Sequence, residues 1–265
     1  GITSEKSQEI TERFNRIDFS RSARILYTEK VLKSFVDTQY EKVENIDLDD
    51  LNINVLLIKA LGFTTVEETI EFYIYQRITR SVVTSWGSKA LEEICMISGA
   101  EDISSSENVE VQGKKFDMKI EKNEKKHYVQ LKSGPNTMNV GMVDSLNNMI
   151  DEIEKKNSNA VGMLGMAYGK ESQISSQIKG NLNDFNKKAV IGEEFWEFLT
   201  DQDDYYADLI ELITALSEEY EEQYDDDYLD VVEQQKQKLV EEWENRYGGE
   251  DDGSLSDFVG ELTKR

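Results

Sequence analysis

The chain has 265 residues, of which 54 are acidic and 30 basic, so its formal net charge at pH 7 is -24. Its single cysteine and single histidine exclude a disulfide framework, a thiolate zinc site and any site that needs two imidazoles. A charged share of 32% is typical of a helix-rich soluble protein. No apolar run approaches the ~20 residues of a membrane span, and no cationic leader opens the sequence, so we expect a cytoplasmic protein.

The N-terminal third predicts helices. Apolar residues recur at helical spacing over residues 5–40, and a second apolar stretch covers residues 51–61 before Gly62. Thr65 followed by Glu68 predicts the cap of a long helix. The buried stripe of that helix is expected to consist of Val66, Ile70, Ile74, Ile78 and Val82. Residues 85–88 are expected to break this helix, with Ser88 capping the next one.

The middle of the chain changes to the period of a strand. Phe116, Met118 and Ile120 alternate with polar residues, a polar turn is expected at 121–126, and a second strand at 128–132. Pro135 cannot donate to a sheet ladder, so it ends that strand. A helix near 144–155 and strands at 160–168 and 188–191 complete an α+β core with a mixed β-sheet. The C-terminal region is expected to be helical, with one stripe formed by Leu229, Val232, Leu239, Trp243 and Tyr247.

Charge is distributed unevenly along the chain. Residues 201–265 contain 22 acidic and 5 basic residues, whereas residues 111–140 contain seven lysines and three acids. The overall balance, taken alone, argues against nucleic acid. The hairpin is nevertheless a basic island, and its lysines are expected to cluster on one side of the protein. They are Lys114, Lys115, Lys119, Lys122, Lys125 and Lys126.

Three side chains of the hairpin form a candidate catalytic group. Asp117 belongs to the first strand, while Gln130 and Lys132 share a face of the second. Side chains directly opposite each other on antiparallel strands lie about 5 Å apart. A carboxylate oxygen, an amide oxygen and an ammonium group in one place suit Mg²⁺-dependent hydrolysis of a phosphodiester. The alternative is a solvated polar face, which alternation by itself favours.

The amino-acid sequence of this segment also resembles that of a known family. Lys115-Phe116-Asp117, eleven further residues and then residues 129–137, which read Val-Gln-Leu-Lys-Ser-Gly-Pro-Asn-Thr, resemble the PD-(D/E)XK nuclease superfamily, and within it the type II restriction endonucleases. The segments around Phe63 to Trp86 and around Gly192 to Trp196 are similar to the helical branch of dimeric enzymes that cut interrupted GC-rich palindromes. The resemblance covers roughly residues 50–200.

The resemblance implies roles for individual residues. Asp117 and Gln130 would bind Mg²⁺, with Mn²⁺ as a possible substitute, Leu131 would lend its backbone carbonyl, and Lys132 would serve the nucleophilic water. The family usually has Asp or Glu at the position of Gln130, so metal binding should be weaker. An acid on the preceding helix, Glu92 or Glu93, is the best candidate to restore the charge.

The same resemblance implies partners and an organisation. We expect a homodimer that cleaves double-stranded DNA at a short palindrome, leaves 5′-phosphate ends and has a cognate DNA methyltransferase as genomic neighbour. Polar residues after the second strand are candidates for DNA contacts: Ser133, Asn136, Thr137 and Asn139. As an α+β protein, the chain would comprise an N-terminal helical arm (1–61), a catalytic core (62–200) and an acidic helical region (201–265).

Two other functions fit the same sequence. A structure-selective repair or recombination nuclease would keep the fold and the chemistry but cut without a palindrome. A DNA-binding or scaffold protein whose metal site has decayed through Gln130 would not cleave DNA at all.

Overall fold

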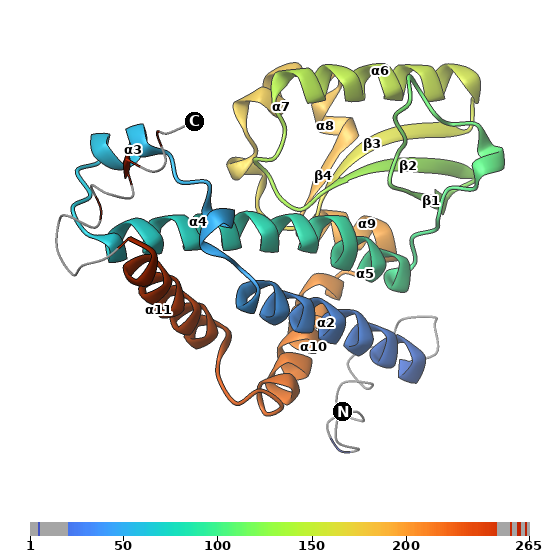
Figure 1. Ribbon diagram of the computed structural model, residues 1–265. Coiled ribbons are helices and arrows are strands. Elements are labelled where there is room, and N and C mark those ends of the chain that lie inside the picture. Colours follow the sequence, from blue (N-terminus) through green and yellow to red (C-terminus); the bar gives the residue numbers. More distant parts are fainter. Residues whose placement is uncertain (1–4, 6–20, 248–254, 256–258, 261–262, 264–265) are drawn as a thin grey trace. The chain divides into compact units, whose positions relative to one another are not determined.

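Four strands form one mixed sheet in the computed structural model, which describes residues 5, 21–247, 255, 259–260 and 263. The strands are β1 (Met118–Lys122), β2 (Lys125–Lys132), β3 (Ala160–Met166) and β4 (Ala189–Ile191), in this spatial order. β1 and β2 pair antiparallel, and β2–β3 and β3–β4 pair parallel. This mixed sheet with many surrounding helices confirms the predicted α+β class (Figure 1).

The helical elements are, in chain order, α2 (Arg21–Glu44), η1 (Leu48–Leu51), α3 (Val55–Ala60), α4 (Val66–Ser85), η2 (Trp86–Ala90), α5 (Leu91–Ser98), η3 (Ser105–Glu107), α6 (Val140–Lys156), η4 (Glu171–Gln173), α7 (Ser176–Asn181), α8 (Phe185–Lys188), α9 (Glu193–Thr200), α10 (Tyr205–Glu221) and α11 (Tyr228–Tyr247). None of the described helices combines the length and the apolar character that a membrane crossing requires.

The chain divides into two compact units, each made of two separate stretches. One unit combines Gly1–Leu32 with Trp86–Glu219, and the other combines Lys33–Ser85 with Tyr220–Arg265. We call them the sheet unit and the helical unit. The expected division by role, at residues 61 and 200, concerns function rather than compactness and stays a prediction.

Helices cover both faces of the sheet in the sheet unit, and α6 runs along one of them (Figure 1). Two glycines of β3 allow helices to pack closely on the two faces of this strand. A Cβ atom on Gly162 would meet Ile150 of α6 at 2.8 Å, and one on Gly165 would meet Phe195 of α9 at 2.6 Å. Because side chains alternate between faces along a strand, α6 and α9 lie on opposite sides of β3. The close approach of both helices depends on these two missing side chains.

The hairpin of β1 and β2 is tighter than the sequence predicts. The strands run to Lys122 and from Lys125, so only Asn123 and Glu124 connect them. Both have positive φ, 54° and 64°, as in the two-residue turns that match the twist of a hairpin. The expected polar turn at 121–126 is therefore mostly strand.

The helical unit has its own core, in which α11 packs on α4 and η1. The predicted cap of α4 is confirmed, since the Glu68 N–H donates to Thr65 Oγ1 at 3.1 Å. Ile70 and Ile74 of the predicted stripe are fully buried, and Trp243 packs in the same cluster. The buried Lys236 ammonium lies among carboxylates of α4 and α11, the nearest being Glu233 at 2.8 Å. Burial of a lysine is tolerated here because its charge is paired.

Two predictions of local structure are wrong. Residues 85–88 do not break the helix, because the chain continues through a π-helical turn, η2, into α5, and Ala90 rather than Ser88 occupies the cap with helical φ and ψ. Leu229 is 65% exposed and does not join the core stripe of α11; Val231 is buried instead, next to Val232 of the predicted stripe. The helix expected around residues 6–20 lies outside the described residues.

Replacement of Gly165 by alanine should destabilise the fold. The new Cβ would lie 2.6 Å from the ring of Phe195, which is fully buried and cannot swing aside, so the cost should be about 1–3 kcal/mol. Urea unfolding of Gly165→Ala measures it. Gly180→Ala is the matched control, because its Cβ on α7 meets nothing within 4 Å. Equal midpoints for the two variants would contradict this packing.

Candidate active site

Asp117 lies immediately before β1, at the point where the hairpin ladder begins to open. Its backbone N–H still donates to the Val129 carbonyl of β2 at 2.9 Å. Its carboxylate Oδ2 accepts the backbone N–H of Leu131 at 2.6 Å. Asp117 is therefore fixed to β2 through both its main chain and its side chain. This hydrogen bond occupies one carboxylate oxygen and leaves the other available.

The backbone carbonyl of Leu131 faces the same side as Asp117. In a strand, the N–H and C=O of one residue point in the same direction, and the direction alternates along the chain. Val129 accepts from Asp117, whereas the carbonyl of Lys132 accepts from Ala167 beyond β3. The odd-numbered residues of β2 thus direct their backbone groups towards β1, and the Leu131 carbonyl lies among them.

Glu92 of α5 is the second acid of the site. The carboxyl groups of Glu92 and Asp117 lie close enough for each to shift the pKa of the other. Of the two acids that the sequence singles out, Glu92 is half-buried, whereas Glu93 is exposed. One residue turns an α-helix by about 100°, which separates the two side chains.

Burial raises the pKa of both acids, and the charge of Asp117 raises the pKa of Glu92 further. The pKa of Glu92 is raised by burial, then by the charge of Asp117 and by the hydrogen bond to it. Burial also raises the pKa of Asp117, although the Leu131 N–H, the Lys132 ammonium and Glu92 act in the opposite direction. Two carboxylates in contact resist double ionisation, which is a common property of sites that bind a cation.

Gln130 and Lys132 lie on β2, one on each side of Leu131. Gln130 is the neighbour of Leu131 on β2, whereas Asp117 lies just beyond Met118–Val129, the last pair of the hairpin ladder. Both Gln130 and Lys132 are half-buried. The charge of Lys132 is close enough to Asp117 to lower the pKa of the carboxyl. The structure therefore brings Asp117, Glu92, Leu131 and Lys132 together, with Gln130 as the residue before Leu131 on the same strand.

The donor set fits a hard divalent cation. No group of three or more His, Cys, Asp and Glu side chains suitable for a metal occurs among the described residues. A cation at this point would instead combine two carboxylates, Asp117 and Glu92, with the Leu131 carbonyl and the Gln130 amide oxygen. Mg²⁺ prefers oxygen ligands of this kind and retains water for the remaining positions.

The polar residues after β2 have local structural roles. The Asn139 side chain accepts the Met142 N–H at 2.9 Å and caps α6, and Thr137 Oγ1 donates to the Gly134 carbonyl at 3.3 Å. Ser133 packs against η2, with Oγ 2.7 Å from where a Cβ of Gly87 would lie. Asn136 is exposed. Their expected DNA contacts stay a prediction, which Asn136 fits best because its side chain is open to solvent.

The lysines of the basic island are partly neutralised by acids of the sheet unit. Lys119 pairs with Glu107 at 2.6 Å, and Lys122 pairs with Asp201 at 2.8 Å. Hydrogen bonds from Lys119, Ser104 and Tyr128 outweigh burial and hold the pKa of Glu107 at about 2. Sequence reasoning missed Glu107, although the Ser104-x-x-Glu107 spacing is a capping signal. That all six lysines face DNA stays a prediction, but three of them have an acidic partner, because Lys115 also lies 3.9 Å from Glu110.

Replacement of Glu92 by glutamine should stabilise the metal-free protein at pH 7. Because the pKa of Glu92 is raised on folding, its contribution to stability is greatest at acidic pH and is lost as pH rises through that raised pKa. Thermal unfolding in EDTA should give Glu92→Gln a higher midpoint than the wild type at pH 7, and a smaller difference below pH 4.5. Glu93→Gln is the exposed control. A midpoint for Glu92→Gln at or below that of the control would contradict the acid pair.

Comparison with known proteins places the chain in a family. Residues 24–221 match the family described as Type II restriction endonuclease EcoO109I. This range takes in most of α2, all four strands and α4 to α10. No curated protein matches the chain. Since the family match covers well over half of the 265 residues, the chain belongs to the type II restriction endonuclease family of EcoO109I, whose enzymes are DNA-cleaving hydrolases.

Proposed function

We propose that the chain hydrolyses double-stranded DNA at a short palindromic sequence, as a Mg²⁺-dependent homodimer that leaves 5′-phosphate ends. The observation that carries this proposal is the contact between Glu92 and Asp117 beside Leu131 and Lys132 in a member of a restriction endonuclease family. An interrupted GC-rich site and a cognate DNA methyltransferase encoded nearby belong to the same proposal.

The acid pair argues against decay of the site. Gln130 lacks the negative charge that the superfamily motif usually supplies, but Glu92 brings a second carboxylate to Asp117 from another element. The total charge available to a divalent ion is therefore that of two acids. A scaffold protein would have no use for two half-buried carboxyl groups placed side by side, which cost folding stability.

The residues have separate tasks in this reaction. Mg²⁺ at the acid pair supplies Lewis acidity, which polarises the scissile phosphate and makes water a better nucleophile. Lys132 orients the attacking water and offsets the charge that develops on the phosphate oxygens. A bond forms between the water oxygen and phosphorus while the bond to the 3′ oxygen breaks, so the phosphate stays on the 5′ end. Leu131 N–H holds Asp117 in place throughout.

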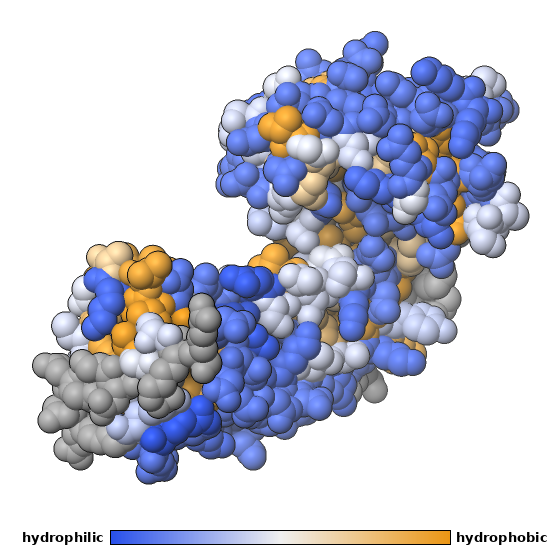
Figure 2. Space-filling view, turned by 45° about the horizontal axis from the view of Figure 1, so that its top comes forward, coloured by the Kyte–Doolittle hydropathy of each residue, from blue (hydrophilic) through white to orange (hydrophobic). Residues whose placement is uncertain are grey.

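An exposed apolar face of the helical unit supports the homodimer. Leu61, Phe72 and Tyr75 are 51%, 38% and 37% exposed and line a depression of about 990 Å³ between the end of α3 and α4. Figure 2 shows hydrophobic side chains gathered on the surface over α3. Contiguous apolar surface of this kind marks protein–protein interfaces. A second copy of the chain, related by two-fold symmetry, would match the symmetry of a palindrome.

Digestion of unmethylated phage DNA with Mg²⁺ tests the activity. The wild type should give discrete fragments, and Asp117→Ala and Lys132→Ala should give none. A smear that both variants abolish would indicate the structure-selective nuclease instead. Intact DNA with either Mg²⁺ or Mn²⁺ would contradict the proposed enzyme.

Replacement of Gln130 by glutamate should increase the affinity for Mg²⁺. The new carboxylate adds the negative charge that an amide oxygen lacks at the same position, so half-maximal cleavage should need less Mg²⁺. Gln130→Ala, which removes the oxygen, should shift the requirement in the opposite direction. A Mg²⁺ titration of cleavage rates compares the three proteins. Identical titration curves would remove Gln130 from the metal site.

The dimer can be tested with two matched leucines. Leu61→Glu should shift the mass in solution from dimer to monomer, because it buries a charge in the proposed interface. Leu229→Glu places the same charge on an exposed leucine of α11, outside this face, and should leave the mass unchanged. Light scattering after gel filtration measures both. A dimeric Leu61→Glu protein would contradict this interface.

A further inference from the structure

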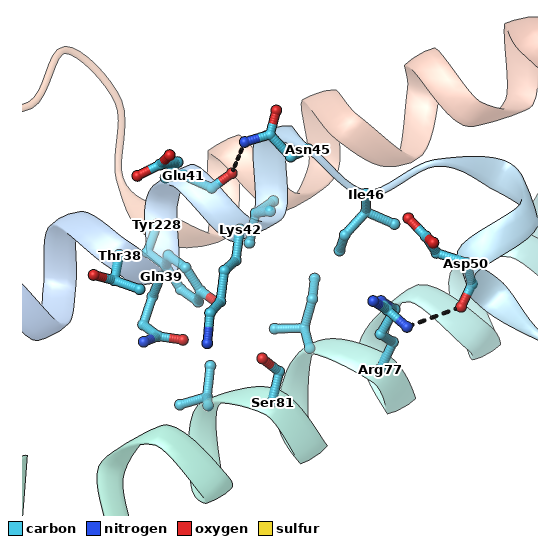
Figure 3. A pocket seen from close by; sticks show the side chains of 13 residues that line it. Thr38, Gln39, Glu41, Lys42, Asn45, Ile46, Asp50, Arg77, Ser81 and Tyr228 are labelled. Carbon is cyan, nitrogen blue, oxygen red and sulfur yellow. Dashed lines mark hydrogen bonds between the residues drawn. The ribbon is translucent and has the colours of Figure 1, made fainter. Parts of the chain in front are cut away.

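Two adjoining depressions of about 450 and 490 Å³ lie between α2 and α4 of the helical unit. They share four lining residues: Lys42, Asp50, Arg77 and Ser81. Figure 3 shows the side chains of Lys42 and Arg77 extending from facing helices into the space between them, with Ser81 on the same helix as Arg77. We call this place the α2/α4 cavity. It contains none of the catalytic candidates, all of which belong to the sheet unit.

Both cations are held in position by neutral oxygen atoms. Lys42 Nζ donates to Ser85 Oγ at 2.8 Å, and Arg77 Nη1 donates to the backbone carbonyl of Asp50 at 3.0 Å. These hydrogen bonds restrain the two side chains without cancelling their charge. A guanidinium has five N–H donors, so Arg77 keeps donors for a ligand.

The two acids that line the cavity, Glu41 and Asp50, form no ion pair with its cations. Asp50 directs its carboxylate to the N–H of Asp47, at 2.9 Å, and in Figure 3 the Glu41 side chain turns away from the Lys42 ammonium. Lys42 and Arg77 form no ion pair with a described carboxylate, whereas Lys236 and Arg246 of the same unit do. Uncompensated cations stand out in a chain of net charge -24.

The sequence of α4 agrees with a local excess of positive charge. Between Glu71 and Glu92 the chain has Arg77, Arg80 and Lys89 and no acid. Arg80 is exposed and lines the second depression together with Gln76. Arginine, serine and glutamine side chains on one helix face are the donors that typically contact DNA phosphates.

A tyrosine with a buried hydroxyl also lines the cavity. Tyr228 of α11 lines it, and the Tyr228 hydroxyl is buried without a hydrogen-bond partner in the described part of the chain. Burial raises the pKa of Tyr228, so the group remains a donor at neutral pH. Buried polar atoms rarely go unpaired, because the lost hydrogen bond with water costs about 1–3 kcal/mol. The unpaired Tyr228 hydroxyl is thus an unsatisfied polar atom in a residue that lines the cavity.

We propose that the α2/α4 cavity binds a backbone phosphate of duplex DNA through Lys42, Arg77 and Ser81, away from the bond that is cut. The contact is independent of sequence, because phosphates carry no base information. It adds attraction for DNA to a chain of net charge -24, and it gives the helical unit a share in substrate binding. The identity of the phosphodiester as DNA rests on the proposed function.

The salt dependence of DNA binding tests this site. Fluorescence anisotropy of a labelled duplex of arbitrary sequence, in EDTA so that no cleavage occurs, gives the slope of log affinity against log salt concentration. Each lost phosphate contact should reduce that slope by about 0.9. Arg77→Gln should therefore lower the slope by about 1 and weaken binding to all sequences alike.

Matched variants separate this effect from a loss of folding. Lys59→Gln removes one exposed charge of α3, outside the cavity, and should leave the slope near the wild-type value. Arg77→Lys keeps the charge and should retain most of the slope. Equal slopes for Arg77→Gln and Lys59→Gln would overturn the site. Stabilisation of the wild type, but not of Arg77→Gln, by inorganic phosphate alone, with no change in the DNA slope, would also overturn it and indicate a free anion.

The experiments distinguish failure of the phosphate site in the α2/α4 cavity from failure of the proposed nuclease function. Cleavage of phage DNA together with an unchanged slope in Arg77→Gln would remove the cavity but keep the nuclease. A reduced slope in a protein that never cleaves DNA would support the cavity and leave a DNA-binding protein without catalysis. Asp117→Ala should keep the wild-type slope, because Asp117 lies outside the cavity.

Discussion

The hydrogen bond from the Leu131 N–H to the Asp117 carboxylate determines where the candidate chemistry lies. It joins the start of β1 to β2 at the point where the hairpin opens, and it sets Asp117 against Glu92 of α5. The Leu131 carbonyl and the Lys132 ammonium follow from the alternation of the same strand. β2 is central in the sheet, paired on both sides, so the site is built on one of its most constrained elements. Rigid support of this kind keeps two repelling carboxyl groups in contact.

An acidic protein that acts on DNA needs a local surface on which positively charged side chains are not paired with acids. The hairpin is the obvious basic segment, yet Lys119 and Lys122 are paired with Glu107 and Asp201. The less basic helix α4, which has two arginines and no acid after Glu71, presents charge that the described acids do not cancel. Local compensation, rather than the number of lysines in a segment, decides which surface attracts phosphate. A strongly negative remainder should also make DNA binding sensitive to salt.

Periodicity predicted the regular elements well. The failures occurred where a local signal was overridden by the continuing helix or by tertiary contacts. Alternation at 116–120 identified the hairpin, and the Thr65 cap identified α4, because both signals lie within a few residues. The sequence around Trp86 reads as a break, but the helical ladder continues as a π-helical turn, which needs no special residue. Leu229 matched the helical spacing, yet whether a residue of the first turn is covered depends on tertiary contacts. The candidate site followed from Asp117, Gln130 and Lys132, whereas the choice of Glu92 over Glu93 required the orientation of α5. The α2/α4 cavity joins residues 42, 77 and 228, and no local pattern predicts such a contact.

The central claim is that the acid pair beside β2 holds the catalytic cation, and Mn²⁺ anomalous diffraction tests it most directly. Crystals soaked in Mn²⁺ should show an anomalous peak at ligand distance from an Asp117 carboxylate oxygen and the Leu131 carbonyl, with Glu92 and Gln130 around it. The peak should be absent from Asp117→Ala crystals. A peak elsewhere in the wild type, or one that persists in Asp117→Ala, would contradict this account of the site.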